Sequence, residues 1–396
     1  MEGSKRLENV RWRHAAGFVR SLWLAVGLTI LLLAALEGVA RVDLLFSSPD
    51  ADRRIRADAY PPEPWVAELY QENARSARLR WESYVNWRRL PFAGKHINID
   101  DRGLRRTWQP PAAEGKPPLK IFFFGASAVW GTGVRDDHTI PSELGRYLYE
   151  SGVPADVSNF GETGWVSTQS VIALLRELQR DNVPDLAIFY GGSNDTFSTF
   201  QNRAPGLPQN EPHRVREFNL LRHARRLVRE TLGVIADRSR LVNLIRSAAP
   251  PAPAPGPPPG LVDETLRVLD ANLAAADALA TRWGFRINVF WEPCLFTKRH
   301  LTPWEERRSG PLEYARGWLL SAYDRVRHDW ASRDPGEFTY LGDLFAETEG
   351  PRFVDHSHTS EVANREIAEA IGRQLIAHGR LRRRDAGEEP AARPSR

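Results

Sequence analysis

Residue types that act in acyl transfer stand just after the most apolar runs of this chain. Ser127 follows the run Leu119–Gly125 in "LKIFFFGASAVWG", where a buried strand would end at a glycine. A serine at such a turn can be a nucleophile, part of a phosphate-binding loop or a helix cap. The segment lacks both the Gly-Lys-Ser/Thr ending of a phosphate loop and the G-x-G-x-x-G dinucleotide pattern. We therefore interpret Ser127 as a candidate nucleophile.

Three later segments carry the other groups that acyl transfer needs. Gly161 in "NFGETGW" would offer an unobstructed backbone N–H, and Asn194 in "GGSNDT" an amide donor. In "FVDHSHTS", Asp355 and His358 are three residues apart, so the carboxylate can orient the imidazole. Taken singly, each is better explained as a strand end, a turn or a helix start, and it is their combination that favours catalysis. A metal site at Asp355, His356 and His358 is the weaker interpretation, because the spacing is crowded and no further ligand cluster stands out. We predict no metal and no cofactor.

These segments follow separate strands of one predicted sheet. Strand and helix patterns alternate over residues 119–379, which favours a parallel sheet with helices on both faces. The predicted strands are 119–125, 155–161, 185–192, 286–293 and 338–345, and the predicted helices include 142–152, 167–182, 262–284 and 360–379. We expect Ser167 or Thr168 to cap the second helix. Ligands of such sheets bind at the carboxyl ends of the strands, so the candidate residues should meet at one edge.

The motif blocks "GASAVWG", "NFG", "GSND" and "DHSH", in this order, resemble those of the SGNH hydrolases, which include the GDSL esterases and lipases. The resemblance spans roughly residues 120–371, with one insertion excepted. It implies a three-layer α/β/α sandwich with a five-stranded, flavodoxin-like parallel sheet. By position it implies that Ser127 is the nucleophile, His358 the general base and Asp355 its orienting acid, with oxyanion donors at Ser127, Gly161 and Asn194. Ala126 replaces the acidic residue that often precedes the serine, so the family's substrate preferences do not transfer.

The N-terminal segment predicts a membrane anchor. Residues 21–41 are almost unbroken in apolar character, and about 20 such residues cross ~30 Å of hydrocarbon as a helix. Arginines precede the run, so residues 1–20 should stay in the cytoplasm and the rest should be translocated. Glu37 can pair with Arg41 four positions later, at the far interface. A signal peptide cleaved near Ala40 is the alternative. Together with "NIDDRGLRR", the anchor resembles a membrane-tethered bacterial subgroup connected with cell-envelope or exopolysaccharide acylation, which implies the inner membrane and a periplasmic catalytic domain.

The rest of the chain divides by composition. We predict a connector at 42–118, a hydrolase-like domain at 119–379 with an insertion at about 204–260, and a disordered tail at 380–396. The insertion contains "APPAPAPGPPPG", an extended spacer. A net charge of +4 is spread among mixed charges, which does not indicate nucleic-acid binding. A lone cysteine, Cys294, excludes an internal disulfide and is interpreted as a buried apolar residue.

The combined prediction is a serine-dependent esterase that acts outside the cytoplasm on an acylated carbohydrate or a small ester, with envelope polysaccharide machinery as a possible partner. An O-acetyltransferase of cell-envelope polysaccharide or exopolysaccharide shares every motif and is the first alternative. A non-catalytic glycan-binding or scaffold component of a polysaccharide export complex is the second. Trp130 and Trp165 would either line a sugar cleft or pack beneath the loops.

Overall fold

The computed structural model describes residues 2–46, 60, 64–111, 117–222, 231, 233, 235–248, 258–309 and 313–384. The chain forms two compact units. One comprises residues 1–53 and 215–254, and the other comprises residues 54–214 and 255–396. Residues 249–257 of the proline-rich spacer and residues 385–396 of the tail predicted at 380–396 lie outside the described residues. The first residues of that tail, 380–384, are described, and the Arg384 N–H donates to Asp185 Oδ1 at 2.9 Å. The predicted domain division therefore stays a prediction.

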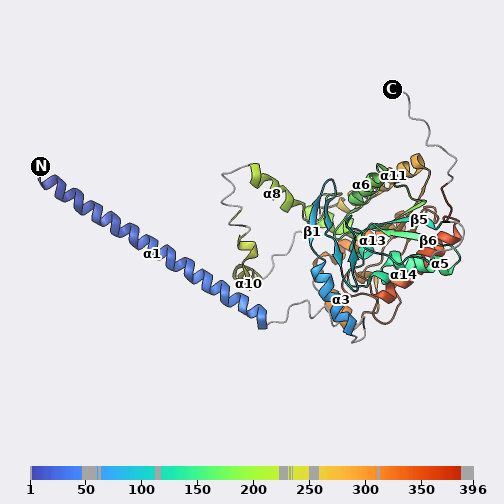
Figure 1. Ribbon diagram of the computed structural model, residues 1–396, viewed down its shortest axis with the longest axis horizontal. Coiled ribbons are helices and arrows are strands. Elements are labelled where there is room, and N and C mark those ends of the chain that lie inside the picture. Colours follow the sequence, from blue (N-terminus) through green and yellow to red (C-terminus); the bar gives the residue numbers. More distant parts are fainter. Residues whose placement is uncertain are drawn as a thin grey trace, which may run out of the picture. The chain divides into compact units, whose positions relative to one another are not determined.

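The larger unit is built on a five-stranded parallel sheet (Figure 1). Its strands are β5 (Leu119–Gly125), β6 (Ala155–Asn159), β7 (Leu186–Gly191), β8 (Arg286–Trp291) and β9 (Phe338–Tyr340). They lie in the order β6-β5-β7-β8-β9, which is the flavodoxin-like order with its switch point between the first and third strands along the chain. The predicted α/β class and five-stranded sheet are confirmed, although β6, β7, β8 and β9 end one to five residues earlier than expected.

Helices cover both faces of this sheet, which explains the continuous apolar run of β5. Ile121 and Phe123 pack with α5 (Ile140–Glu150) and α14 (Glu361–Ala377) on one face. Phe122 and Phe124 pack on the other face in the core cluster formed with α6 (Ser167–Leu178), α11 (Leu261–Trp283) and α13 (Glu313–Asp329). Successive side chains of a strand point to opposite faces, so a strand buried on both faces has no polar alternation.

The first turn of α6 corrects one prediction. The helix begins after Val166, whose N–H donates to Gln169 Oε1 at 3.2 Å, so neither Ser167 nor Thr168 is its cap. The hydroxyl of Ser167 instead donates to Asp195 Oδ1 at 2.5 Å. The Ser167 side chain therefore pairs with a carboxylate from a distant segment and does not cap the helix.

Further helices and 3-10 turns are α3 (Pro64–Arg75), α4 (Ser127–Trp130), η1 (Asp136–His138), α7 (Ser193–Asn202), α8 (Glu211–Arg222), η2 (Leu295–Thr297) and α12 (Pro303–Ser309).

The connector adds two small hairpins to the same unit. Strands β1 (Leu79–Glu82) and β2 (Asn86–Arg89) pair antiparallel, as do β3 (Phe92–Ala93) and β4 (Asn98–Ile99). Gly103 forms a turn with a φ of 82°, a conformation that favours glycine. Arg105 then forms isolated bridges to Ile99 and to Asn159 at the end of β6. The connector is thereby joined to the edge of the main sheet.

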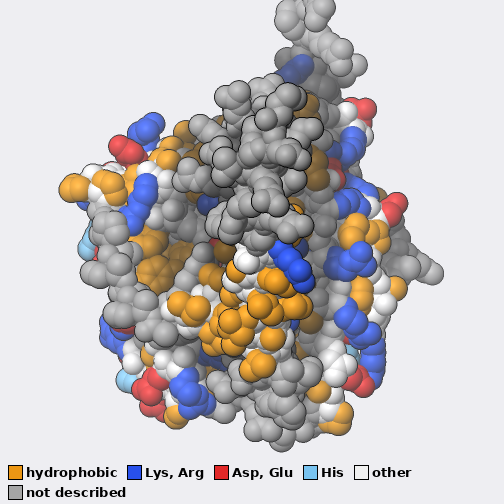
Figure 2. Space-filling view, turned by 90° about the vertical axis from the view of Figure 1, so that its left-hand side faces the viewer, with side chains coloured by type: hydrophobic (Ala, Val, Ile, Leu, Met, Phe, Trp, Pro, Cys, Tyr) orange, Lys and Arg blue, Asp and Glu red, His pale blue; other side chains and the backbone are white. Residues whose placement is uncertain are grey.

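The smaller unit contains α1 (Glu2–Phe46) and α10 (Arg240–Ala248). Within α1, residues 19–41 are long and apolar enough to cross a membrane, and the stretch is largely exposed, although Ala40 near its end is buried. Figure 2, which views the protein from the side of the N-terminus, shows hydrophobic side chains gathered along this helix. The expected pair of Glu37 and Arg41 is present at 2.9 Å. Glu37 also accepts hydrogen bonds from Ser239 Oγ at 2.7 Å and from the Arg240 N–H at 3.0 Å, so it caps the start of α10.

Candidate active site

Ser127 lies at the carboxyl end of β5, on the first turn of the short helix α4. Gly125 makes the sharp exit from the strand possible, because a Cβ there would meet the Tyr190 carbonyl and the Val129 side chain. Gly131 ends α4 with a φ of 92°, a conformation that favours glycine. The two glycines of "GASAVWG" therefore hold a one-turn helix that presents the serine above the sheet.

The three predicted catalytic side chains form one hydrogen-bonded chain. His358 Nε2 lies 2.8 Å from Ser127 Oγ, and His358 Nδ1 lies 2.7 Å from Asp355 Oδ2. The other carboxylate oxygen, Asp355 Oδ1, accepts the backbone N–H groups of Ser357 at 3.0 Å and His358 at 2.8 Å. Burial acts to raise the pKa of Asp355, but the charge of His358 and these hydrogen bonds outweigh it and hold the pKa well below its usual range. The carboxylate thus stays ionised beside the imidazole.

Asn194 reaches the same pocket as the serine, whereas the N–H of Gly161 is already engaged. Asn194 is the second residue of α7 and donates one amide N–H to the Trp165 carbonyl at 3.0 Å. Gly161 N–H donates to Asn159 Oδ1 at 2.9 Å. A Cβ at Gly161 would lie 2.8 Å from the Val129 carbonyl carbon, so close packing against α4 also requires glycine there. The predicted oxyanion role of Gly161 stays a prediction.

A pocket of about 190 Å³ contains Ser127, Asn194 and His358. One part of its lining is apolar, formed by Phe197, Cys294, Phe296 and Leu319. Another part carries polar or small residues, namely Thr163, Gly164 and Gln209. Trp130 and Trp165 are less than 2% exposed and pack beneath the loops, which decides between the two roles considered for them.

A buried carboxyl group that the sequence reasoning missed supports the asparagine segment. Glu292 follows β8 and is 4% exposed. Its Oε1 accepts the Ser193 N–H at 3.1 Å and the Ser193 hydroxyl at 2.6 Å, and Tyr323 Oη lies 3.0 Å from that hydroxyl. Burial raises the pKa of Glu292. Its position at the end of a predicted strand was the signal that could have identified it.

Asp195 gives a stability prediction with a defined pH window. It is 6% exposed and accepts the Ser167 N–H at 3.1 Å, and burial raises its pKa to about 6. An unfolded aspartate titrates near ~3.9, so between about pH 4 and pH 6 the native state binds more protons than the unfolded state. The free energy of unfolding should therefore fall by roughly 3 kcal/mol as pH rises through this window. Urea unfolding of Asp195→Asn should lack this slope, and parallel pH profiles for the two proteins would contradict the assignment.

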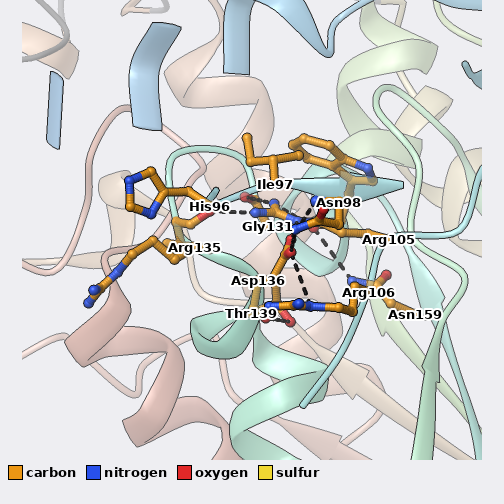
Figure 3. Close-up of polar contacts among 12 residues, drawn as sticks. His96, Ile97, Asn98, Arg105, Arg106, Gly131, Arg135, Asp136, Thr139 and Asn159 are labelled. Carbon is orange, nitrogen blue, oxygen red and sulfur yellow. Dashed lines mark hydrogen bonds and ion pairs between the residues drawn. The ribbon is translucent and has the colours of Figure 1, made fainter. Parts of the chain in front are cut away.

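The connector holds the loop that follows the nucleophile. Arg105 is fully buried in its side chain, with Nε 2.9 Å from Asp136 Oδ1 (Figure 3). Its remaining nitrogens donate to three carbonyls of the loop, those of Trp130 at 3.1 Å, Gly131 at 2.5 Å and Val134 at 2.6 Å. One guanidinium thus supplies a hydrogen-bond donor to each of three carbonyls at or just beyond the end of α4. Sequence reasoning did not assign this role, because the arginine belongs to a separate segment.

A second connector arginine supports the glycine block. Arg89 donates its backbone N–H to Glu162 Oε2 at 2.9 Å, and its Nη2 donates to Thr163 Oγ1 at 2.6 Å. The Glu162 side chain is fully buried, and burial raises its pKa. Arg89 also lies over the ring of Trp130 at 3.6 Å. Because Thr163 lines the pocket, the connector contributes to the shape of the candidate site.

No group of three or more His, Cys, Asp or Glu side chains is arranged to hold a metal ion in the part of the chain that the structure describes. Asp355 is instead hydrogen-bonded to His358, and His358 is hydrogen-bonded to Ser127. Cys294 is a buried free thiol whose pKa is raised by burial to about 11. A buried thiol with a raised pKa is a poor nucleophile, which agrees with its interpretation as a packing residue.

No protein-family model matches the chain, and no curated protein matches it. Solved structures similar to it include AlinE4, an SGNH-hydrolase family esterase, with 15% identity, 67% of this chain and 98% of that chain covered, and a TM-score of 0.31. A catalytic mutant of Axe2, an acetylxylan esterase from Geobacillus stearothermophilus, has 14% identity, 66% and 96% coverage and a TM-score of 0.33. BT4096, a gut microbial diltiazem-metabolizing enzyme, has 13% identity and a TM-score of 0.38, with 69% of this chain and 49% of that chain covered. This chain thus spans about half the length of BT4096. The similarity to SGNH-hydrolase esterases is at low sequence identity and with low TM-scores.

Proposed function

We propose that this protein is a serine-dependent ester hydrolase with a carbohydrate ester or a small acyl ester as substrate. The single observation that carries the proposal is the hydrogen-bonded chain from Ser127 Oγ through the His358 ring to Asp355. A nucleophile, a base and an orienting carboxylate in this geometry are the parts that nucleophilic acyl transfer requires. The pocket supports the proposal, because its apolar part at Phe197 and Leu319 would receive a short acyl group.

In the first half of the proposed reaction, Ser127 Oγ bonds to the ester carbonyl carbon while its proton passes to His358 Nε2. The carbonyl oxygen becomes an oxyanion, which the Asn194 amide and the Ser127 N–H would stabilise by about 3 kcal/mol per donor. Gly161 can join them only after Asn159 Oδ1 releases its N–H. The alcohol then leaves with the proton from His358. In the second half, water adds to the acyl-serine with His358 as base, which releases the acid and restores Ser127.

For the location, we propose that α1 anchors the protein in the bacterial inner membrane, with its N-terminus in the cytoplasm and the hydrolase domain in the periplasm. The apolar and largely exposed stretch Val19–Arg41 and the arginines before it support this orientation. A cleaved signal sequence would give the same compartment without the anchor.

One labelling experiment tests both proposals on the full-length chain. A serine-reactive fluorophosphonate is applied to membranes from cells that express the protein, and the labelled protein is isolated and mapped by mass spectrometry. We expect one adduct, at Ser127, in the wild-type protein and none in Ser127→Ala. In a second assay, the wild-type protein should hydrolyse a chromogenic acetyl ester and Ser127→Ala should not. If wild type and Ser127→Ala react alike in both assays, the catalytic proposal is wrong. A mature N-terminus near Ala40 would exclude the anchor and leave the catalytic result unaffected.

A further inference from the structure

A second cavity, of about 430 Å³, lies between the β1–β2 hairpin, the turn at Gly103 and helix α6. It shares no lining residue with the pocket that contains Ser127. Its charged lining consists of five arginines and three carboxylates, namely Arg80, Arg88, Arg102, Arg176, Arg180, Glu82, Asp101 and Glu177. Gly103 contributes by its missing side chain, because a Cβ there would lie 3.0 Å from Arg88 Cδ.

Two of the carboxylates hold four of the five arginines. Glu82 pairs with Arg176 at 2.7 Å and with Arg80 at 3.6 Å. Glu177 pairs with Arg102 at 2.5 Å and with Arg180 at 2.9 Å. The third carboxylate, Asp101, is exposed at the turn. The lining therefore carries more positive than negative charge, with five arginines against three carboxylates, and Arg88 is the arginine that pairs with none of the three.

The fifth arginine, Arg88, is held without a carboxylate of its own. It is 7% exposed, and its guanidinium lies 4.2 Å from the centre of the Trp165 ring. Its Nη1 is buried with no hydrogen-bond partner among the described residues. Burial lowers the pKa of Arg88, while Glu162, Glu82 and Glu177 act from a distance to raise it. An arginine stays charged in proteins, so this is a buried cation with unused donors.

We propose that this cavity binds a compact anion that carries a phosphate or a carboxylate, with Arg88 as its main contact. The planar guanidinium offers a fork of donors that matches either group, and Trp165 holds that fork in place. Arg88 itself lines the cavity, and the partly exposed Arg176 and Arg180 attract the anion to it. An arginine that was only solvated at the surface would need neither burial nor contact with an aromatic ring. The site is independent of the proposed hydrolase activity.

Calorimetric titration of the full-length protein in detergent tests this inference, with inorganic phosphate and glucuronate as probes at constant ionic strength. At least one probe should bind with a Kd of about 1 mM or tighter. The tighter of the two probes identifies phosphate or carboxylate as the preferred group. Ser127→Ala should bind as wild type does, so loss of hydrolysis and loss of this site are separable. Absence of binding by both probes would overturn the inference.

Substitutions locate the binding site. Arg88→Met retains the apolar stem and should weaken binding at least about tenfold, whereas Arg365→Met on α14 should bind as wild type does. Because Arg88 is buried, Arg180→Glu at the exposed rim provides a variant that spares the core, with Arg365→Glu as its charge-matched control. Arg180→Glu should weaken binding at least about threefold. Wild-type affinity in folded Arg88→Met, or in Arg180→Glu, would show that the anion binds elsewhere.

Discussion

Replacement of His358 by alanine is expected to lower kcat/KM for an acetyl ester by about 10⁴- to 10⁶-fold. The imidazole is the one side chain of the site bonded at the same time to the serine hydroxyl and to a carboxylate, at 2.8 and 2.7 Å. Without it, the Ser127 hydroxyl has no base to accept its proton and remains a weak nucleophile. Initial rates at several ester concentrations give kcat/KM directly, and circular dichroism verifies that the fold is retained.

Two further variants distinguish catalysis from general perturbation. Asp355→Asn should also lower kcat, by up to about 10⁴-fold, since a neutral amide neither fixes the imidazole tautomer nor stabilises the imidazolium. His300→Ala removes an exposed histidine that lies outside the pocket lining and should retain wild-type activity. If His358→Ala loses no more activity than His300→Ala, the proposed role of the hydrogen-bonded chain is wrong.

Replacement of Arg105 by methionine should lower the free energy of unfolding by about 3 to 5 kcal/mol. The side chain is fully buried, so its loss removes the buried cation that pairs with the Asp136 carboxylate and one donor from each of the Trp130, Gly131 and Val134 carbonyls. Since those carbonyls belong to the loop after Ser127, kcat should fall together with stability. Urea unfolding and ester hydrolysis measure the two effects.

The neighbouring residue provides a matched control. Arg106 also approaches Asp136, at 3.4 Å, but its side chain is 56% exposed. An exposed ion pair contributes little, so Arg106→Met should change the free energy of unfolding by less than about 1 kcal/mol. Equal losses for Arg105→Met and Arg106→Met would mean that burial of Arg105 does not stabilise the loop.

Much of the fold and the centre of the site could be predicted from local patterns. Apolar runs predicted the five strands, and a parallel sheet brings its strand ends to one edge because every strand points the same way. Ser127, Asn194 and His358 therefore line one pocket although they lie on separate segments. The pair of Asp355 and His358 followed from a three-residue spacing, which acts within one turn.

What the sequence alone determined is the set of local patterns: the strands, the apolar N-terminal helix and the order of the motif blocks. The tertiary structure decided how those blocks are supported. It placed Arg105 against the loop after Ser127, where its bond to Gly131 joins residues 26 positions apart. It also placed Arg89 against Glu162, 73 positions away. It also directed Asp195 to the start of α6 and gave the Gly161 N–H to Asn159. The physical reason is that the partner of a buried charge or N–H is selected by packing between distant segments, and no local periodicity records that choice.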